Sequence, residues 1–152
     1  MDHKLKASEL FTGGYNCAQA VAVAFGDVTG LEERQAARMA SSFGGGMGRM
    51  REVCGAVSGM LLVLGLLYGY DDPADTAGKK TLYADVQALA GQFRQEAGSI
   101  ICREILKNPP TDPTPAPRTA EYYEKRPCAR MCYIAASVLD EYIAGHPLGE
   151  QA

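Results

Sequence analysis

Apolar residues recur at helical spacing along most of the chain, and no stretch shows the period-two alternation of a half-buried strand. Together with capping residues and stop signals, this pattern predicts an all-α fold of about six or seven helices. Seven segments are predicted, namely residues 2–11, 17–25, 31–43, 53–68, 73–97, 100–107 and a last helix that opens at Pro127 and ends at Gly145. A further short helix around 119–125 is compatible with the sequence. We expect these helices to form one compact bundle, with residues 1–152 as a single helical domain.

The most apolar stretch lies at residues 53–68, where sixteen residues in a row carry no charge. A membrane-spanning helix needs about 20 apolar residues, so this stretch is better explained as a buried helix. Its apolar residues point in all directions, which predicts a central helix surrounded by protein. Its glycines would let neighbouring backbones come close.

Local signals set several helix boundaries. Asn16 is a good N-cap for the helix that begins at residue 17. An Asp cap at Asp71-Asp72, followed by Pro73, predicts the start of the long helix 73–97. Gly98 followed by serine either ends that helix or bends it.

Residues 108–118 contain five of the eight prolines in the chain. Proline disrupts helices, so we expect an extended surface loop there that serves as a plain connector.

Composition narrows the functional classes. The chain has 47% hydrophobic and 22% charged residues and a net charge of −3, with basic residues scattered along it. These values are ordinary for a globular protein and do not indicate binding to nucleic acid or insertion into a membrane. The start, MDHKLKASELF, lacks the apolar core of a signal peptide, so we expect a cytoplasmic protein. A stable disulfide framework is not expected in that compartment.

Four of the five cysteines fall in the first turn of a predicted helix, namely Cys17, Cys54, Cys102 and Cys128. Free N–H groups and a partial positive charge at a helix start favour a thiolate, which lowers the pKa of a cysteine. In an up-and-down bundle, alternate helices start at the same end, so these cysteines are predicted to converge. The proline-rich loop is long enough to bring the helix of Cys128 to that end. The alternative is that buried cysteines act as small hydrophobic residues, and this is the interpretation we give to Cys132.

Several segments around these cysteines match a known cysteine pattern. They are residues 15–21, residues 43–48, Cys54-Gly55-Ala56 through Gly59, Cys102-Arg103, and Cys128 followed by Ala135-Ala136. On these segments, and over nearly its whole length, the chain resembles the redox-active proteins named for the motif C_GCAxxG_C_C. The family name prints Gly-Cys-Ala where this chain reads Cys-Gly-Ala, and we take Cys54 as the match.

The resemblance implies that Cys17, Cys54, Cys102 and Cys128 are the active groups, with Cys132 as an extra cysteine. A similar domain is associated with split-Soret cytochromes c. This chain has no Cys-x-x-Cys-His, so covalent c-type haem is not supported.

Three functions therefore remain open. The first is thiol–disulfide or electron-transfer chemistry by the four cysteines, as in a thiol-based oxidoreductase, with Cys54 as the most reactive thiol because of Arg49, Arg51 and its long helix. The second is a metal or iron–sulfur cluster on the same thiolates, although the chain has no Cys-x-x-Cys pair and the sequence requires no cofactor.

The third function is a binding module for an anion or small ligand at Gly44, Gly45, Gly46 and Arg49, without catalysis. A flexible turn between two helices would explain the same glycines. The only histidines, His3 and His146, lie near the termini, which argues against a Cys–His dyad or a histidine-rich metal site. A redox partner is not identifiable from the sequence, and the apolar load on few helices is compatible with a homodimer.

Overall fold

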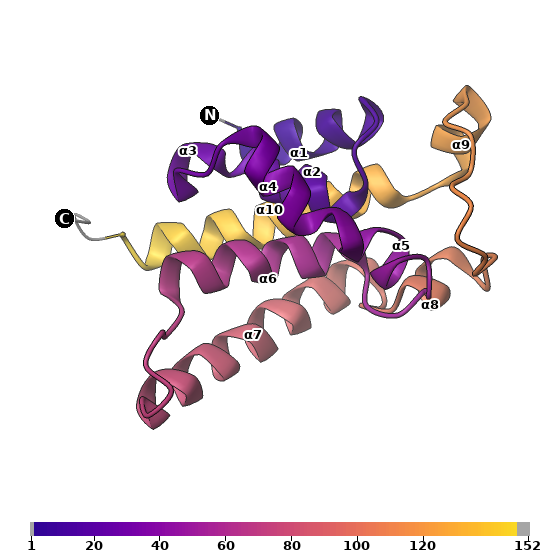
Figure 1. Ribbon diagram of the computed structural model, residues 1–152. Coiled ribbons are helices and arrows are strands. Elements are labelled where there is room, and N and C mark those ends of the chain that lie inside the picture. The colour runs from indigo at the N-terminus through magenta and orange to yellow at the C-terminus, as the bar shows by residue number, and fades with distance from the viewer. Residues whose placement is uncertain (1, 149–152) are drawn as a thin grey trace.

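The computed structural model describes residues 2–148 and consists of helices joined by loops (Figure 1). The helices are α1 (His3–Thr12), α2 (Cys17–Ala24), α3 (Gly26–Thr29), α4 (Glu33–Ala40), the 3-10 turn η1 (Ser41–Phe43), α5 (Gly44–Met47), α6 (Gly55–Tyr68), α7 (Thr76–Ala97), α8 (Cys102–Leu106), α9 (Ala120–Lys125) and α10 (Cys128–Gly145). Within the described part of the chain there is no β-strand, only an isolated antiparallel bridge between Val53 and Ile101. The all-α prediction is confirmed. The helical segments are more numerous than expected because the turns after α2 and η1 each close a short helix, α3 and α5.

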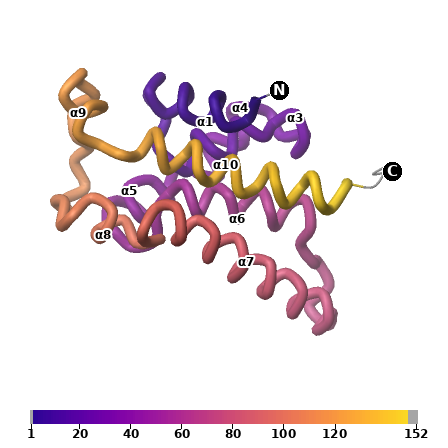
Figure 2. The backbone as a smooth tube through the Cα atoms, turned by 180° about the vertical axis from the view of Figure 1, so that it is seen from behind, coloured from indigo at the N-terminus to yellow at the C-terminus, as the bar shows by residue number. Residues whose placement is uncertain are grey.

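The longer helices run along a common direction. Helices α6 and α10 lie side by side and point the same way, with α1, α2 and α4 on one side of them and α7 on the other (Figures 1 and 2). Helix α1 packs along α10, and α2 packs against both α6 and α1. As a result α2, α6 and α10 all begin at the end of the molecule where α5, α8 and α9 gather.

The core is built around α2 as much as around the predicted central helix. All residues of α2 except Gln19 are buried, whereas α6 buries its first half and leaves Leu66 49% exposed. Leu66 and Met39 of α4, also 49% exposed, line a shallow apolar groove.

That the protein forms a homodimer stays a prediction. None of the helices in residues 2–148 is long and apolar enough to cross a membrane.

Glycine allows α2 and α6 to approach closely. A Cβ atom on Gly59 of α6 would lie 2.6 Å from the carbonyl oxygen of Ala18 in α2. A Cβ on Gly55 would lie 3.2 Å from the Cβ of Cys17. Real Cβ atoms do not tolerate the first of these distances and are rarely as close as the second, so the glycines set the spacing of the two helices.

Capping explains which predicted boundaries were accurate. Asn16 caps α2 as predicted: its side chain accepts from the backbone N–H of Gln19, whose own side chain accepts from Asn16. The start of α7 was predicted wrongly. Asp75 is the N-cap and accepts from the N–H of Gly78, whereas the Asp72 carboxylate closes a turn by accepting from Ala74. Helix α7 then ends at Gly98, which has φ 91°, so Cys102 begins a separate helix.

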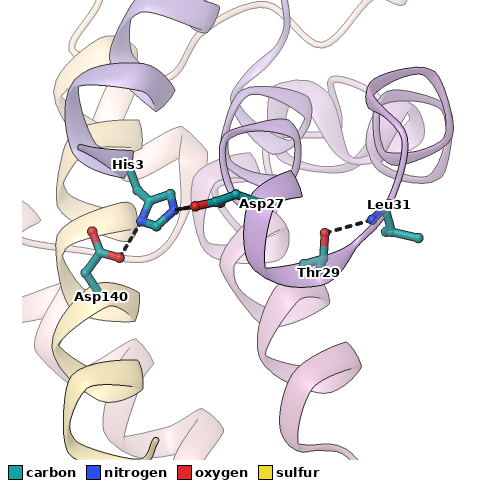
Figure 3. A network of polar contacts seen from close by, with 5 residues as sticks. All are labelled: His3, Asp27, Thr29, Leu31 and Asp140. Carbon is teal, nitrogen blue, oxygen red and sulfur yellow. Dashed lines mark hydrogen bonds and ion pairs between the residues drawn. The ribbon is translucent and has the colours of Figure 1, made fainter. Parts of the chain in front are cut away.

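The end of the bundle opposite α5 and α8 is held by a buried histidine (Figure 3). His3 of α1 lies between two carboxylates, with Nδ1 2.7 Å from Asp140 of α10 and Nε2 2.8 Å from Asp27 of α3. Its ring stacks on Phe25 at 4.1 Å. One side chain thus ties together three segments that are far apart in the sequence.

Candidate functional site

All four predicted cysteines line one cavity of about 390 Å³ at the end where α2, α6 and α10 begin. Cys17, Cys102 and Cys128 are each the first residue of a helix, and Cys54 is the N-cap of α6. All four are buried, and none forms a disulfide. The structure therefore brings together residues that span more than a hundred positions of the chain.

Cys17 and Cys128 begin α2 and α10, two helices that pack against each other. Both thiols line the cavity, and each changes the pKa of the other. Cys132 lies one turn further along α10, is fully buried, and directs its sulfur at the carbonyl of Cys17 at 3.8 Å. It does not line the cavity.

Cys54 and Cys102 are brought together by the short bridge between Val53 and Ile101. The N–H of Cys54 donates to Ile100 at 2.7 Å, and the N–H of Cys102 donates to Glu52 at 2.6 Å. In an antiparallel pair this register puts Cys54 and Cys102 diagonally across from each other, on the same face. Their side chains therefore reach the same cavity from two different loops.

The arginine that was expected to act on Cys54 acts on Cys102 instead. Nη1 of Arg51 lies 3.8 Å from the Cys102 sulfur, and its Nε donates to the carbonyl of Pro110 at 2.9 Å. Next to the bridge, Arg51 lies beside the start of α8, because the N–H of Arg103 donates to the carbonyl of Arg51. The prediction that the arginines make Cys54 the most reactive thiol is therefore not supported by the geometry.

The pKa values of the four thiols are raised, although each stands at a helix start. Burial raises the pKa of Cys54 to about 12, against the opposing effect of the N–H groups of Ala56 and Val57. Burial also raises the pKa of Cys102, and the Arg51 guanidinium offsets part of that rise. The expectation of lowered pKa values was wrong because desolvation of a buried thiolate outweighs the helix dipole.

The two neighbouring thiols influence each other's pKa. The Cys128 thiol lowers the pKa of Cys17, but Cys132, burial and the nearby Cys54 raise it more. The Cys17 thiol and burial raise the pKa of Cys128, with Arg126 and Arg118 opposing them. The net result is that the pKa of both thiols is raised.

The predicted glycine loop forms the cavity wall beside Asn16 and Cys102. A Cβ on Gly44 would collide with the side chain of Asn16, and one on Gly46 would lie 2.7 Å from the Cβ of Cys102. Gly45 and Gly46 both have positive φ, 66° and 70°. The loop is thus more than a flexible turn, because only glycine fits where it packs against the helix starts.

The proline-rich segment is a second wall of the cavity and not a plain connector. Pro113, Pro115 and Arg118 line the cavity. Arg118 donates to the carbonyls of Phe11 and Tyr15, both at 3.1 Å, and so fastens this segment to the end of α1.

Two basic lining residues, Arg118 and Arg126, were not identified from the sequence, whereas Tyr122 was considered as a pocket residue with core packing as the alternative. The guanidinium groups of Arg118 and Arg126 each lie 4.9 Å from the centre of the Tyr122 ring. The position of Arg126 two residues before Cys128 is a sequence signal that could have identified it as a residue of the site.

The four cysteines surround the cavity without forming a compact ligand set. Over residues 2–148, no three Cys, His, Asp or Glu side chains are grouped closely enough to hold a metal ion. A four-thiolate site would need all four sulfurs about 2.3 Å from one ion. The arrangement as it stands suits chemistry between pairs of thiols.

Comparison with protein families matches residues 15–142, which include all five cysteines, to the family described as "Putative redox-active protein (C_GCAxxG_C_C)". The chain belongs to this family. Membership of the C_GCAxxG_C_C family confirms the resemblance found in the sequence and supports a redox role in general. No curated protein and no solved structure matches the chain.

Proposed function

We propose that this member of the C_GCAxxG_C_C family is a thiol–disulfide oxidoreductase in which Cys17 and Cys128 are the exchanging pair. The observation that carries the proposal is that both thiols line one cavity at the starts of two helices, α2 and α10, that pack against each other. Both residues begin a helix, whose free N–H groups oppose the rise in thiol pKa that burial causes.

In this proposal Cys17 is the attacking thiol and Cys128 is the resolving thiol. The Cys17 thiolate attacks one sulfur of a disulfide R–S–S–R, so that a protein–S–S–R bond forms and the R–S–S–R bond breaks. The leaving thiolate RS⁻ takes up the proton that Cys17 released. Cys128 then attacks the sulfur of Cys17, and a second RSH leaves with the Cys128 proton. The two cysteines are oxidised by two electrons, and the disulfide is reduced to two thiols.

Cys54 and Cys102 have a supporting position in this scheme. Their diagonal placement across the bridge makes them less suited to a direct disulfide than residues in contact. The Arg51 guanidinium lies beside the Cys102 sulfur, and Cys102 lines the same cavity as the exchanging pair.

The test is to treat the fully reduced protein with 2-hydroxyethyl disulfide and to map the cysteines by mass spectrometry. We expect one Cys17–Cys128 disulfide and about two equivalents of released thiol per chain. The Cys128→Ser variant should stop at a mixed disulfide on Cys17, because the resolving thiol is gone. The Cys132→Ala variant is the control and should form the same disulfide as the unmodified chain. A protein that stays reduced, or that pairs other cysteines first, would contradict the proposal.

A further inference from the structure

The charges that line the cavity are all of one sign. Four arginines line it, Arg49, Arg51, Arg118 and Arg126, and its lining contains no aspartate or glutamate. The chain as a whole is acidic, with a net charge of −3. The cavity is therefore a basic enclosure in an acidic protein, which attracts anions by its local field.

Arg51 is the most unusual of these groups, because it is only 3% exposed. Its two hydrogen-bond acceptors are the carbonyl of Pro110 and the sulfur of Cys102, and no ion pair in the described residues includes it. A buried cation without a carboxylate partner is costly, and such groups are usually paired. An anion that enters the cavity would supply the missing partner.

Arg49 adds an unsatisfied donor to this unpaired cation. Its Nε is buried and has no hydrogen-bond partner, unlike most buried polar atoms. The glycine loop folds against both residues, since a Cβ on Gly45 would lie 2.8 Å from Cγ of Arg49 and 3.6 Å from Nη1 of Arg51. The loop thus brings two guanidinium groups to the same wall.

The arginines form two pairs. Arg49 and Arg51 lie beside Gly45, whereas the guanidinium groups of Arg118 and Arg126 both lie over the ring of Tyr122. Within residues 2–148, Arg118 and Arg126 also form no ion pair with a carboxylate. A disulfide that carries an anionic group at each end would place its S–S bond between these two positive regions.

We propose that the substrate of the cavity is a small disulfide with a carboxylate or another anionic group on each half, held by Arg51 and Arg49 on one side and by Arg118 and Arg126 on the other. This inference rests on the proposed function, because it names the substrate class of the same thiols. The cavity volume of about 390 Å³ is within the range of small-molecule sites.

The first experiment compares three disulfides of similar length and different charge. They are 3,3′-dithiodipropionate (anionic), 2-hydroxyethyl disulfide (neutral) and cystamine (cationic). The measured quantity is the rate of thiol loss from the protein, divided by the rate of the same disulfide with dithiothreitol. We expect the anionic disulfide to exceed the cationic one by about tenfold or more at low ionic strength, and salt to reduce this preference.

Matched variants locate the preference in the cavity. Arg51→Gln should lower the anionic preference about tenfold, because a charge-assisted hydrogen bond is lost. Arg51→Lys keeps the charge and should keep most of the preference, which separates charge from folding. Arg130→Gln is the control: Arg130 is an exposed residue of α10 outside the cavity lining, and its loss changes the net charge equally.

A second experiment measures binding without redox chemistry. Suberate is 3,3′-dithiodipropionate with the S–S bond replaced by C–C, and 1,6-hexanediol is the same analogue of 2-hydroxyethyl disulfide. By calorimetry we expect suberate to bind, hexanediol not to bind, and Arg51→Gln to abolish suberate binding. Equal normalised rates for the three disulfides, with no binding of suberate, would overturn the inference and leave the proposed function standing. Suberate binding without oxidation by any disulfide would overturn the proposed function and support the anionic site.

Discussion

The two ends of the helical bundle treat charge in opposite ways. At the end around His3, buried or half-buried polar groups are matched: His3 contacts two carboxylates, and Tyr142 donates to Asp85 at 2.7 Å. At the cavity end, Arg51 is buried without a carboxylate and Nε of Arg49 has no partner. At the His3 end these polar groups have partners within the chain. At the cavity end the arginines lack carboxylate partners, which the proposed anionic ligand would supply.

The backbone shows the same contrast. All the non-glycine residues with positive φ in the described chain lie at the cavity end, in residues 47–51 and 107–108. Such conformations cost about 1–3 kcal/mol each and persist where the surrounding structure fixes them. The strained backbone and the unpaired charges at the cavity end are thus held in place by the well-packed helices that extend to the His3 end.

The largest expected effect comes from breaking the cavity end at a glycine. Gly46→Ala would put a methyl group 2.7 Å from the Cβ of Cys102 at a residue with φ 70°. We expect a loss of about 2–4 kcal/mol in the free energy of unfolding, measured in urea.

The matched substitution in the more exposed half of α6 is Gly65→Ala, where no atom lies within 4 Å of the new Cβ. It should raise the free energy of unfolding by up to about 1 kcal/mol, because alanine is the better helix former. If Gly46→Ala were as well tolerated as this control, the close packing of the loop would not matter for stability.

Breaking the opposite end should affect stability without affecting the thiols. His3→Ala removes both contacts to Asp27 and Asp140 and the stacking on Phe25. We expect the free energy of unfolding to fall by about 2 kcal/mol. The rate of thiol oxidation by 2-hydroxyethyl disulfide should not change in conditions where the variant is folded. A slowed oxidation would show that the two ends are coupled.

The pH dependence of stability distinguishes the two ends, because Cys54 titrates at the cavity end and Tyr142 at the His3 end. Burial raises the pKa of Cys54 to about 12, so between its unfolded pKa and 12 the unfolded chain has lost a proton that the folded chain keeps. The stabilising contribution is complete below pH of about 8.5 and is lost as the pH rises, by about 1 kcal/mol per pH unit for one such thiol.

Urea unfolding under reducing conditions at pH 8, 9 and 10 measures this slope. Cys54→Ala should make it smaller. Tyr142→Phe is the control at the other end. Burial and Asp85 raise the pKa of Tyr142 to about 12 from a higher starting value, so this residue contributes mainly above pH of about 10. A slope that Cys54→Ala leaves unchanged between pH 8 and 10 would contradict the burial argument.

The smallest expected effect on stability comes from a substitution of Arg51, the buried cation that has no carboxylate partner. Arg51→Met replaces a buried charge by an apolar side chain of similar length, which is often neutral or stabilising. We expect the free energy of unfolding to change by less than about 1 kcal/mol or to rise. The same variant should no longer bind suberate, as expected for Arg51→Gln. A large loss of stability would mean that Arg51 is a structural residue first.

Much of the fold could be predicted from local patterns. Asn16 was identified as a cap because capping needs only the neighbouring turn, and α2 begins where it predicts. The start of α7 was missed because three aspartates compete there, and the backbone path selected Asp75 over Asp72. The convergence of helix starts followed from alternation of helix direction, which is a rule of connectivity and not of detailed packing.

The candidate site was predictable in its residues and not in its pairings. The sequence alone determined that four cysteines stand at helix starts, since capping and periodicity are local properties. Only the tertiary structure decided that Cys17 and Cys128 line the same cavity and that Arg51 lies beside the Cys102 sulfur. It also decided that the proline-rich segment closes the cavity and that burial outweighs the helix dipole in setting the thiol pKa values. These outcomes depend on contacts between distant segments and on desolvation, which arise only when the whole chain has packed.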